Sequence, residues 1–322
     1  MEYFRILITG LLGFLLSSVA LAQNYPTKSV RFMVGFAAGG AADITARILA
    51  QKLSELWGQT VIVDNRPGAS GIIGAETVAK AAPDGYILLI SPQTSTATAA
   101  SYYPKLPYDV LRDFTIITVA TSSPLILVLH PSLPPHSFHE FISFAKVNFK
   151  SLSFGSGGRG SGPHLAGELL NLALNIKMTH IPYKGENLAA IDTIGGQMPL
   201  MLPTLPVGLP HVKTGKLRGI AVTSLHRSTS APEYPSIAES GIPGFESAPW
   251  IAMYAPAALP PSIVSKLNTD VVRALQFPDV LDRLVQQGID RVGNSQEQAS
   301  AYLRAEMTKW AQVIKNANLH AD

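Results

Sequence analysis

The chain contains no cysteine among its 322 residues, so it can form neither a disulfide nor a thiolate metal site. Charge is also scarce: charged residues make up 15% of the sequence, the net charge is +3, and the basic residues are scattered. Nucleic-acid binding requires a basic stripe, so we expect no nucleic-acid partner. No apolar run after residue 22 is long enough to cross a bilayer, and we expect no membrane insertion of the mature chain.

The first residues have the pattern of an export signal. Arg5 gives a positive start, residues 6–20 form an almost unbroken apolar run, and Ala20-Leu21-Ala22 is a small-x-small cleavage pattern. A membrane anchor is the alternative, but this run is shorter than the ~20 residues that a span needs. We therefore expect residues 1–22 to be a signal peptide, cleaved before Gln23, and the mature protein to lie outside the cytoplasm.

The rest of the chain alternates apolar strands with amphipathic helices, which is typical of an α/β protein with mainly parallel sheets. We expect strands at 30–36, 61–63, 86–90, 114–129 (broken at 122–124), 152–154, 179–181, 198–202, 217–223 and 250–254. We expect helices at 43–57, 138–146, 163–175 and 189–194. A further helix should start after the loop at residues 65–71 and end near residue 80, and a terminal pair of helices should follow residue 260. The chain would cross between two lobes near 124 and 250, which predicts one lobe from 23–124 with 250–322 and another from 125–249.

Twice an apolar strand runs into a glycine-rich loop that opens onto a helix, at residues 31–43 and 152–164. Such loops leave backbone N–H groups unpaired at the positive end of a helix, where an anion binds well. Ligand sites in α/β sheets lie at the carboxyl ends of strands, where these loops are found. The two loops therefore predict two anion-binding edges around one cleft, although glycines that serve only sharp turns are the alternative.

Other chemistry is not supported by the sequence. Gly155-x-Gly157-x-x-Gly160 has the dinucleotide spacing, but the next strand runs into Ile181-Pro182-Tyr183-Lys184 and lacks the acidic residue that would hold a ribose. His136 and His139 have no third metal ligand nearby. There is no Gly-x-Ser-x-Gly elbow and no evident catalytic triad, so we expect neither an enzyme nor a bound metal or cofactor.

Eight short motifs, taken in order, carry a resemblance that covers essentially the whole mature chain. They are Tyr25-Pro26, Gly39-Gly40-Ala41-Ala42-Asp43, Val63-Asp64-Asn65-Arg66-Pro67-Gly68-Ala69, Ala82-Pro83-Asp84-Gly85-Tyr86, Leu106-Pro107-Tyr108-Asp109, Pro163-His164-Leu165-Ala166-Gly167-Glu168, Ile181-Pro182-Tyr183-Lys184-Gly185 and Gly195-Gly196-Gln197. The chain resembles the extracytoplasmic solute receptors of tripartite tricarboxylate transporters, the Bug or TctC family.

The resemblance implies a two-lobed periplasmic-binding-protein fold of type II, a Venus flytrap whose lobes are mainly parallel sheets flanked by helices. It implies a periplasmic monomer that closes on a small organic carboxylate and delivers it to the membrane permease subunits of a tripartite transporter. A sensor that feeds a kinase of a two-component system is an alternative, and a secreted carboxylate-processing enzyme is another. The sequence does not separate the first two.

The resemblance also implies the ligand contacts. One half of a pincer would be residues 38–43 and the other residues 156–161, with a further loop around residue 93. The expected binding residues are Phe36, Ala38, Gly39, Gly40, Ala42, Asp43, Gln93, Thr94, Ser156, Gly157, Gly160, Ser161, His164 and Pro203.

Three of the residues in or beside the loops have alternatives. Asp43 is equally a first-turn carboxylate that stabilises its helix. A histidine in the place of His164 more often packs or caps than contacts a ligand, and Arg159, the only cation within either loop, rims the cleft or is solvated. Pro199 and Pro203 stand where many members of the family carry aspartates. Since a carboxylate there would pair with a ligand ammonium, we expect a ligand without an amino group.

Overall fold

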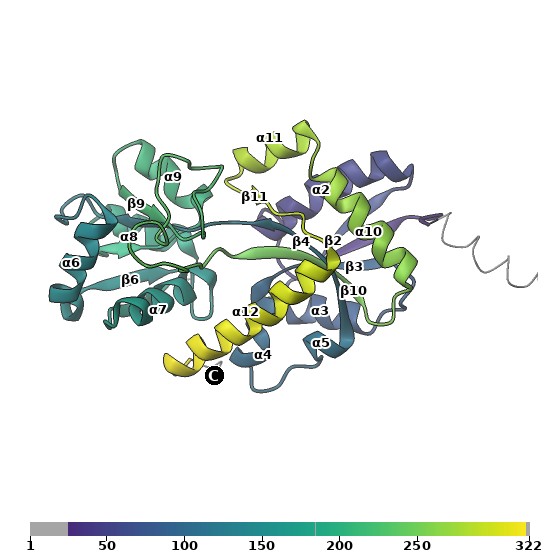
Figure 1. The fold of residues 1–322 in the computed structure, drawn as a ribbon, viewed down its shortest axis with the longest axis horizontal. Helices are drawn as coiled ribbons and strands as arrows, with labels where there is room; N and C mark the ends of the chain where they lie inside the picture. The colour runs from purple at the N-terminus through teal and green to yellow at the C-terminus, as the bar shows by residue number, and fades with distance from the viewer. Residues whose placement is uncertain (1–24, 184, 320–322) are drawn as a thin grey trace, which may run out of the picture.

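The computed structural model describes residues 25–183 and 185–319, and the predicted signal peptide and its cleavage site lie outside these residues. Two α/β lobes lie side by side along the long axis of the molecule, each built on its own sheet (Figure 1). No helix within the described ranges combines the length and the apolarity that a membrane span requires.

The first lobe contains a six-stranded sheet in the order β11-β4-β10-β3-β1-β2. Its strands are β1 (Val30–Val34), β2 (Val61–Asn65), β3 (Ile87–Pro92), β4 (Phe114–Ser122), β10 (Trp250–Pro256) and β11 (Asp290–Arg291). Strand β1 is parallel to β2 and β3, whereas β10 is antiparallel to both of its neighbours. Strand β10 returns from the second lobe, so it enters this sheet from the opposite end to the strands that begin within the lobe.

The second lobe contains a five-stranded sheet in the order β7-β6-β8-β5-β9. Its strands are β5 (Ile126–Leu129), β6 (Ser153–Ser156), β7 (Thr179–Pro182), β8 (Leu200–Met201) and β9 (Arg218–Val222). Strand β6 is parallel to β7 and β8, and β5, which arrives directly from β4, is antiparallel to β8 and β9. In each sheet, one of the strands that run antiparallel to the majority follows directly after a crossing between the lobes: β10 in the first sheet and β5 in the second.

Helices cover both faces of both sheets. In the first lobe α2 (Ala41–Trp57), α10 (Pro261–Ala274) and α11 (Pro278–Gln286) pack on one face, and α3 (Ile72–Ala79), α5 (Val110–Asp113) and part of α12 (Gln296–Asn316) on the other. Side chains alternate along a strand, so Phe32 enters the first of these cores and Met33 the second. In the second lobe α6 (Phe138–Asn148) and α7 (Gly162–Leu174) face α8 (Glu186–Ile194) and α9 (Leu205–Lys213) across the sheet.

Besides the four-residue helices α4 (Ala99–Tyr102) and α5, two longer helices were not expected from the sequence pattern. Helix α9 contains Pro206 in its first turn, where the missing N–H costs nothing, and Pro210 in its interior. Helix α11 makes the terminal pair a group of three. The apolar face of α9 is completed by packing on the second sheet, which a local pattern does not reveal, whereas α11 is strongly amphipathic in its own sequence, with Val280 and Leu284 on its buried face.

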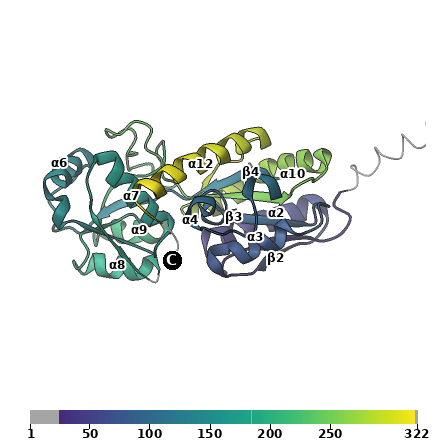
Figure 2. The same ribbon diagram turned by 90° about the horizontal axis from the view of Figure 1, so that it is seen from below.

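The C-terminal helix joins the lobes. Helix α12 lies against β4 and α4 (Ala99–Tyr102) and reaches α7 of the second lobe (Figures 1 and 2). A small apolar cluster fills this junction; its buried members are Tyr102, Leu165, Trp310, Val313 and Ile314. Glu306 of α12 accepts hydrogen bonds from Trp310 Nε1 (2.8 Å) and from Trp250 Nε1 (2.9 Å) on the returning strand β10. One buried carboxylate therefore ties α12 to the second crossing.

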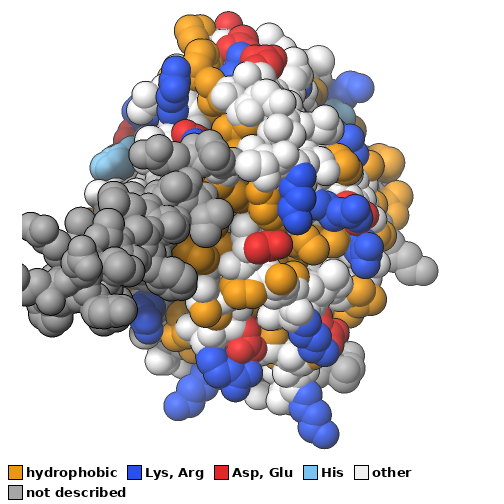
Figure 3. Space-filling view, turned by 90° about the vertical axis from the view of Figure 1, so that its right-hand side faces the viewer, with side chains coloured by type: hydrophobic (Ala, Val, Ile, Leu, Met, Phe, Trp, Pro, Cys, Tyr) orange, Lys and Arg blue, Asp and Glu red, His pale blue; other side chains and the backbone are white. Residues whose placement is uncertain are grey.

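The end of the first lobe has a mixed surface. In Figure 3, Lys and Arg side chains stand in separate groups among hydrophobic and uncharged side chains over the visible part of this face. That distribution agrees with the low net charge of the sequence.

Candidate ligand-binding site

A cleft of about 330 Å³ lies between the lobes. Its walls are formed by loops and helix starts from both lobes. From the first lobe they are Phe36, Ser70, Pro92, Gln93, Thr94, Thr98, Tyr102 and Tyr103, and from the second Gly157, residues 159–163, Glu186, Thr204 and Pro249.

The predicted site residues fall into three groups in the structure. Six of them line the cleft: Phe36, Gln93, Thr94, Gly157, Gly160 and Ser161. The loop at residues 37–40 is exposed and lies outside the cleft lining. Asp43, Ser156 and His164 are buried beneath their loops, and neither Ala42 nor Pro203 lines the cleft. The role of these residues in binding stays a prediction.

The wall from the first lobe carries two unsatisfied polar side chains. Gln93 and Thr98 are 1% and 2% exposed, and Gln93 Oε1 and Thr98 Oγ1 find no hydrogen-bond partner among the described residues. Buried polar atoms in folded proteins are nearly always paired, so this pair points to a guest in the cleft. Thr98 was not expected from the sequence, because nothing in its local pattern differs from that of its neighbours.

The segment that carries these side chains is held firmly. Tyr108 of the Leu106-Pro107-Tyr108-Asp109 motif donates its hydroxyl to Ser95 O at 2.6 Å, and Tyr254 Oη lies 3.1 Å from Thr96 Oγ1. Both tyrosines are buried. The motif from which the family resemblance was drawn thus supports the turn between β3 and α4.

The second glycine loop is organised by hydrogen bonds of its own. Gly158 N–H donates to Ser156 Oγ (3.1 Å), and Gly160 N–H donates to His164 Nδ1 (2.9 Å). Ser161 Oγ donates to Gly158 O (2.7 Å) and caps the first turn of α7. These bonds fix the loop before any ligand arrives.

Three donors of this loop remain open. The backbone N–H groups of Gly157, Arg159 and Gly162 donate to no acceptor among the described residues. Gly162 is the first residue of the thirteen-residue helix α7, whose positive end faces the cleft. Together with the side chain of Arg159 they make this wall suited to an anion.

Two stacked histidines support the loop from below. The ring centroids of His164 and His180 are 3.8 Å apart, and His180 Nε2 lies 2.7 Å from Ser156 Oγ. Burial, aided by the charge of Arg159, lowers the pKa of His164 to about 4. Burial, together with His164 and Arg159, lowers the pKa of His180 to about 3. Both rings are therefore neutral near pH 7, and His164 acts as a cap for the loop. His180 was not expected; only the pairing of β6 with β7, which sets it opposite Phe154, brings it here.

Asp43 has a comparable structural role in the first loop. Its carboxylate accepts hydrogen bonds from Gly39 N–H (2.9 Å), Arg47 Nε (2.9 Å) and Asn65 Nδ2 (3.0 Å), and its side chain is 3% exposed. Burial alone would raise its pKa, but the bonds from Arg47, Gly39 and Asn65 outweigh burial and lower it. Asp43 therefore shapes the loop and consumes one of its N–H groups. The backbone N–H groups of Gly40, Ala41 and Ala42 have no acceptor among the described residues.

Among the described residues, Glu186 is the one acidic residue in the cleft lining, and the sequence did not single it out. Its Oε2 accepts hydrogen bonds from the N–H and the Oγ1 of Thr204, both at 3.0 Å. Burial raises the pKa of this carboxyl, and the two bonds from Thr204 oppose that rise without cancelling it. The first position of a helix is a favourable place for a carboxylate, which is the only local signal that could have drawn attention to it.

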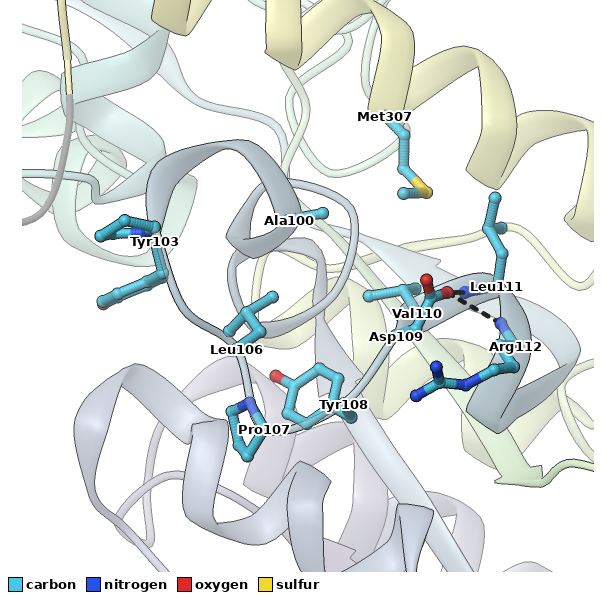
Figure 4. Close-up of a pocket in the computed structure, with 11 residues that line it drawn as sticks. Ala100, Tyr103, Leu106, Pro107, Tyr108, Asp109, Val110, Leu111, Arg112 and Met307 are labelled. Atoms are coloured by element: carbon cyan, nitrogen blue, oxygen red, sulfur yellow. Dashed lines mark hydrogen bonds between the residues drawn. The ribbon is translucent and has the colours of Figure 1, made fainter.

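A second depression, of about 450 Å³, lies beside the cleft on the first lobe (Figure 4). It is lined by Ala100, by residues 103, 104 and 106–112, and by Met307 of α12. Asp109 in this lining caps α5 by accepting from the N–H groups of Leu111 and Arg112. Neither glycine loop reaches it. Among the described residues no three His, Asp or Glu side chains gather as a metal site would require.

Two α/β lobes joined by crossing strands, with a cleft of open amide donors between them, define a two-lobed periplasmic binding protein. The family model for the receptor of the tripartite tricarboxylate transporter family matches residues 45–319, and the chain belongs to that family. This is a family of solute-binding receptors and not of enzymes. The family resemblance and the fold expected from the sequence are thereby confirmed.

Individual relatives agree with this assignment. The chain is 36% identical to the protein BugT of Bordetella pertussis over 295 residues, which is 91% of this chain and 90% of BugT. Rpa4515 of Rhodopseudomonas palustris, solved with adipate, is 35% identical with a TM-score of 0.78, covering 92% of this chain and 99% of the other. MatC of the same organism, solved with bound malate, is 30% identical with a TM-score of 0.72, covering 90% and 100%.

Proposed function

We propose that this chain captures a small organic carboxylate in the interlobe cleft and delivers it to the membrane permease of a tripartite tricarboxylate-type transporter. The observation that carries the proposal is that both walls of the cleft present polar groups that a ligand could bind. Gln93 and Thr98 bring polar atoms from one lobe, and the second glycine loop brings three N–H donors from the other, none of which finds a partner among the described residues. Similar proteins have been solved with adipate and with malate, which are small carboxylates.

The energetics are adequate without metal or catalytic chemistry. Hydrogen bonds to a charged group contribute ~1.5–3 kcal/mol each. Three backbone donors and the Thr98 hydroxyl would give roughly 6–12 kcal/mol before the cost of association, which is at least several kcal/mol. Micromolar affinity corresponds to about −8 kcal/mol, so the strongest geometries of these four bonds are required.

Closure of the lobes would bring the N–H groups of the first glycine loop (residues 38–43) to the ligand as additional donors. The N–H groups at the start of α2 that have no acceptor among the described residues lie outside the cleft lining, and they belong to residues that range from exposed (Gly40) to buried (Ala42). A ligand that gains these donors only when the lobes approach binds the closed form more tightly, and that difference shifts the population toward closure. We take residues 23–124 with 250–322 as one moving body and 125–249 as the other, because β5 to β9 fall within the second range.

The cellular setting follows from the family and from the N-terminal sequence. Residues 1–22 have the pattern of an export signal with cleavage before Gln23, and the family is one of periplasmic receptors. We therefore propose a periplasmic monomer whose closed form docks on the permease subunits. Release of the carboxylate to the permease would reopen the cleft.

Native mass spectrometry of freshly purified protein tests ligand capture, followed by calorimetric titration with a panel of carboxylates that includes adipate and malate. We expect a bound carboxylic acid or micromolar affinity for at least one member. Gln93→Leu should lower that affinity at least tenfold. Ser123→Ala is the matched control, since Ser123 Oγ is also buried without a partner among the described residues but lies outside the cleft lining. A protein that carries no acid and binds none of the panel would contradict the proposal.

A further inference from the structure

Glu186 presents a half-satisfied carboxyl to the cleft. Its Oε2 is held by two hydrogen bonds from Thr204, whereas its Oε1 accepts none from the described residues. A carboxylate in a partly buried setting is costly unless its oxygens are hydrogen-bonded. The fixed Oε2 therefore orients the group, and Oε1, which has no donor among the described residues, is left for something that enters the cleft.

The carboxyl lies next to the open donors of the second glycine loop. A Cβ atom placed on Gly157 would lie 3.1 Å from Glu186 Cγ and 3.2 Å from its backbone nitrogen, so the loop and Glu186 are in close contact here. A ligand carboxylate that binds the N–H groups of Gly157 and Arg159 would therefore meet Glu186 within a short distance. Two ionised carboxylates at close range repel each other, so the part of the ligand that faces Glu186 must be different.

A second acceptor lies in the opposite wall. Gln93 Oε1 is buried in the cleft lining and has no donor among the described residues. The amide could also be turned so that its nitrogen faces the cleft. Burial raises the pKa of the Glu186 carboxyl, so its role as an acceptor belongs to the ionised form, which a ligand donor at Oε1 would favour. The cleft thus combines donors for an anion on one loop with an acceptor that needs a donor close by.

We propose that Glu186 is a specificity-determining residue that selects carboxylates carrying a hydrogen-bond donor, either a hydroxyl or an ammonium group. This inference rests on the proposed capture of a carboxylate by the same cleft. The donor on the ligand binds Glu186 Oε1 while the carboxylate binds the second glycine loop. An analogue without the donor leaves Oε1 desolvated and unpaired, which lowers affinity on the order of 10- to 100-fold.

The experiment is calorimetric titration of the full mature chain with matched acids that differ in one group. One series is succinate, malate and aspartate, and a second is glutarate, 2-hydroxyglutarate and glutamate. Wild-type protein should bind the hydroxyl or the ammonium member at least tenfold more tightly than the unsubstituted acid of that series. The two substituted members distinguish the source of the donor, and a preference for the hydroxyl would also agree with the expected absence of an amino group.

Glu186→Gln keeps the size of the side chain and an oxygen for Thr204, but it turns the other polar atom into a donor. We expect this variant to lose the preference and to bind the unsubstituted acid as tightly as or more tightly than wild type. Glu297→Gln removes the same charge from the exposed first turn of α12 and should leave every affinity unchanged. Circular dichroism and thermal melting establish that both variants are folded, and Glu186→Ala gives a second measure of the lost preference.

The outcomes separate this inference from the proposed function. If wild type binds none of these acids or any other carboxylate, the capture of a carboxylate fails. If wild type binds unsubstituted acids as tightly as their substituted partners, or if Glu186→Gln keeps the wild-type ratio, the role of Glu186 is overturned while capture stands.

Discussion

The imidazole rings of His164 and His180 stack with their planes 19° apart directly beneath the second glycine loop. Each ring holds a different part of that loop, His164 through Gly160 N–H and His180 through Ser156 Oγ. The shape of the cleft wall therefore depends on two side chains that do not line the cleft.

This pair should make the protein sensitive to acid. Burial lowers the pKa of His164 from 6.5 to about 4 and that of His180 to about 3, so the unfolded chain takes up protons first as the pH falls. The stabilisation is complete above pH 6.5 and is lost as the pH falls toward 4, by on the order of 3 kcal/mol for His164. Urea denaturation at pH 7 and at pH 4.5 measures the loss.

A variant and a control test whether the stacked histidines cause this loss of stability in acid. His180→Phe keeps an aromatic ring in the stack but removes one titrating group, and it should lose less stability between the two pH values than wild type does. His139→Gln alters an exposed histidine on α6 and should show the wild-type loss. Equal losses in all three proteins would show that the stacked pair is not responsible.

Asp43 should matter for stability more than a surface carboxylate. Asp43→Ala removes the acceptor for Gly39, Arg47 and Asn65, and we expect the free energy of unfolding to fall by about 2–4 kcal/mol. Asp64→Ala removes a carboxylate that pairs with the exposed Arg31 and should cost less than ~1 kcal/mol. Urea denaturation of both variants makes the comparison, and similar losses would mean that the bonds of Asp43 contribute little.

Gly160 should be needed for binding as well as for its backbone conformation. Its φ is +73°, and a Cβ atom there would lie 2.9 Å from Tyr102 Cζ in the opposite wall of the cleft. Gly215 has a φ of +71° with nothing within 4 Å of the same position. Alanine at either site should cost ~1–2 kcal/mol of stability through backbone strain. Only Gly160→Ala should also weaken carboxylate binding, as measured by calorimetry with the tightest acid of the panel; unchanged binding would contradict this.

Glu306 should stabilise the junction through hydrogen bonding. Glu306→Leu leaves the indole N–H groups of Trp250 and Trp310 without an acceptor, and we expect a loss of about 2–5 kcal/mol. Glu306→Gln keeps an oxygen that can accept from both and loses only the charge that pairs with Lys309, so its loss should be smaller. Thermal denaturation of the two variants tests this order, and a glutamine variant as unstable as the leucine variant would show that charge dominates.

Local periodicity predicted most of the fold. The helix expected at 43–57 is α2, at 41–57, because its apolar positions recur on one face. The break expected at residues 122–124 separates β4 from β5. Helix α9 was missed because Pro206 and Pro210 disguise it, and only its packing on the second sheet completes its apolar face.

The candidate site was predicted less completely for a different reason. A glycine-rich loop can be recognised directly in the amino-acid sequence, so Gly157 and Gly160, which line the cleft, were among the residues expected there. Glu186, Thr98 and His180 depend on which strands become neighbours and on how the lobes face each other, and neither relation is written in a local motif.

Two segments near the end of the chain, β11 and α12, contact the second lobe at separate places. Asp290 accepts hydrogen bonds from Thr229 and Ser230 on one flank, and the end of α12 packs on Leu165 on the other. These ties hold the two lobes to each other on both flanks of the molecule. Receptors of this design can thus evolve a different ease of opening through changes far from the ligand.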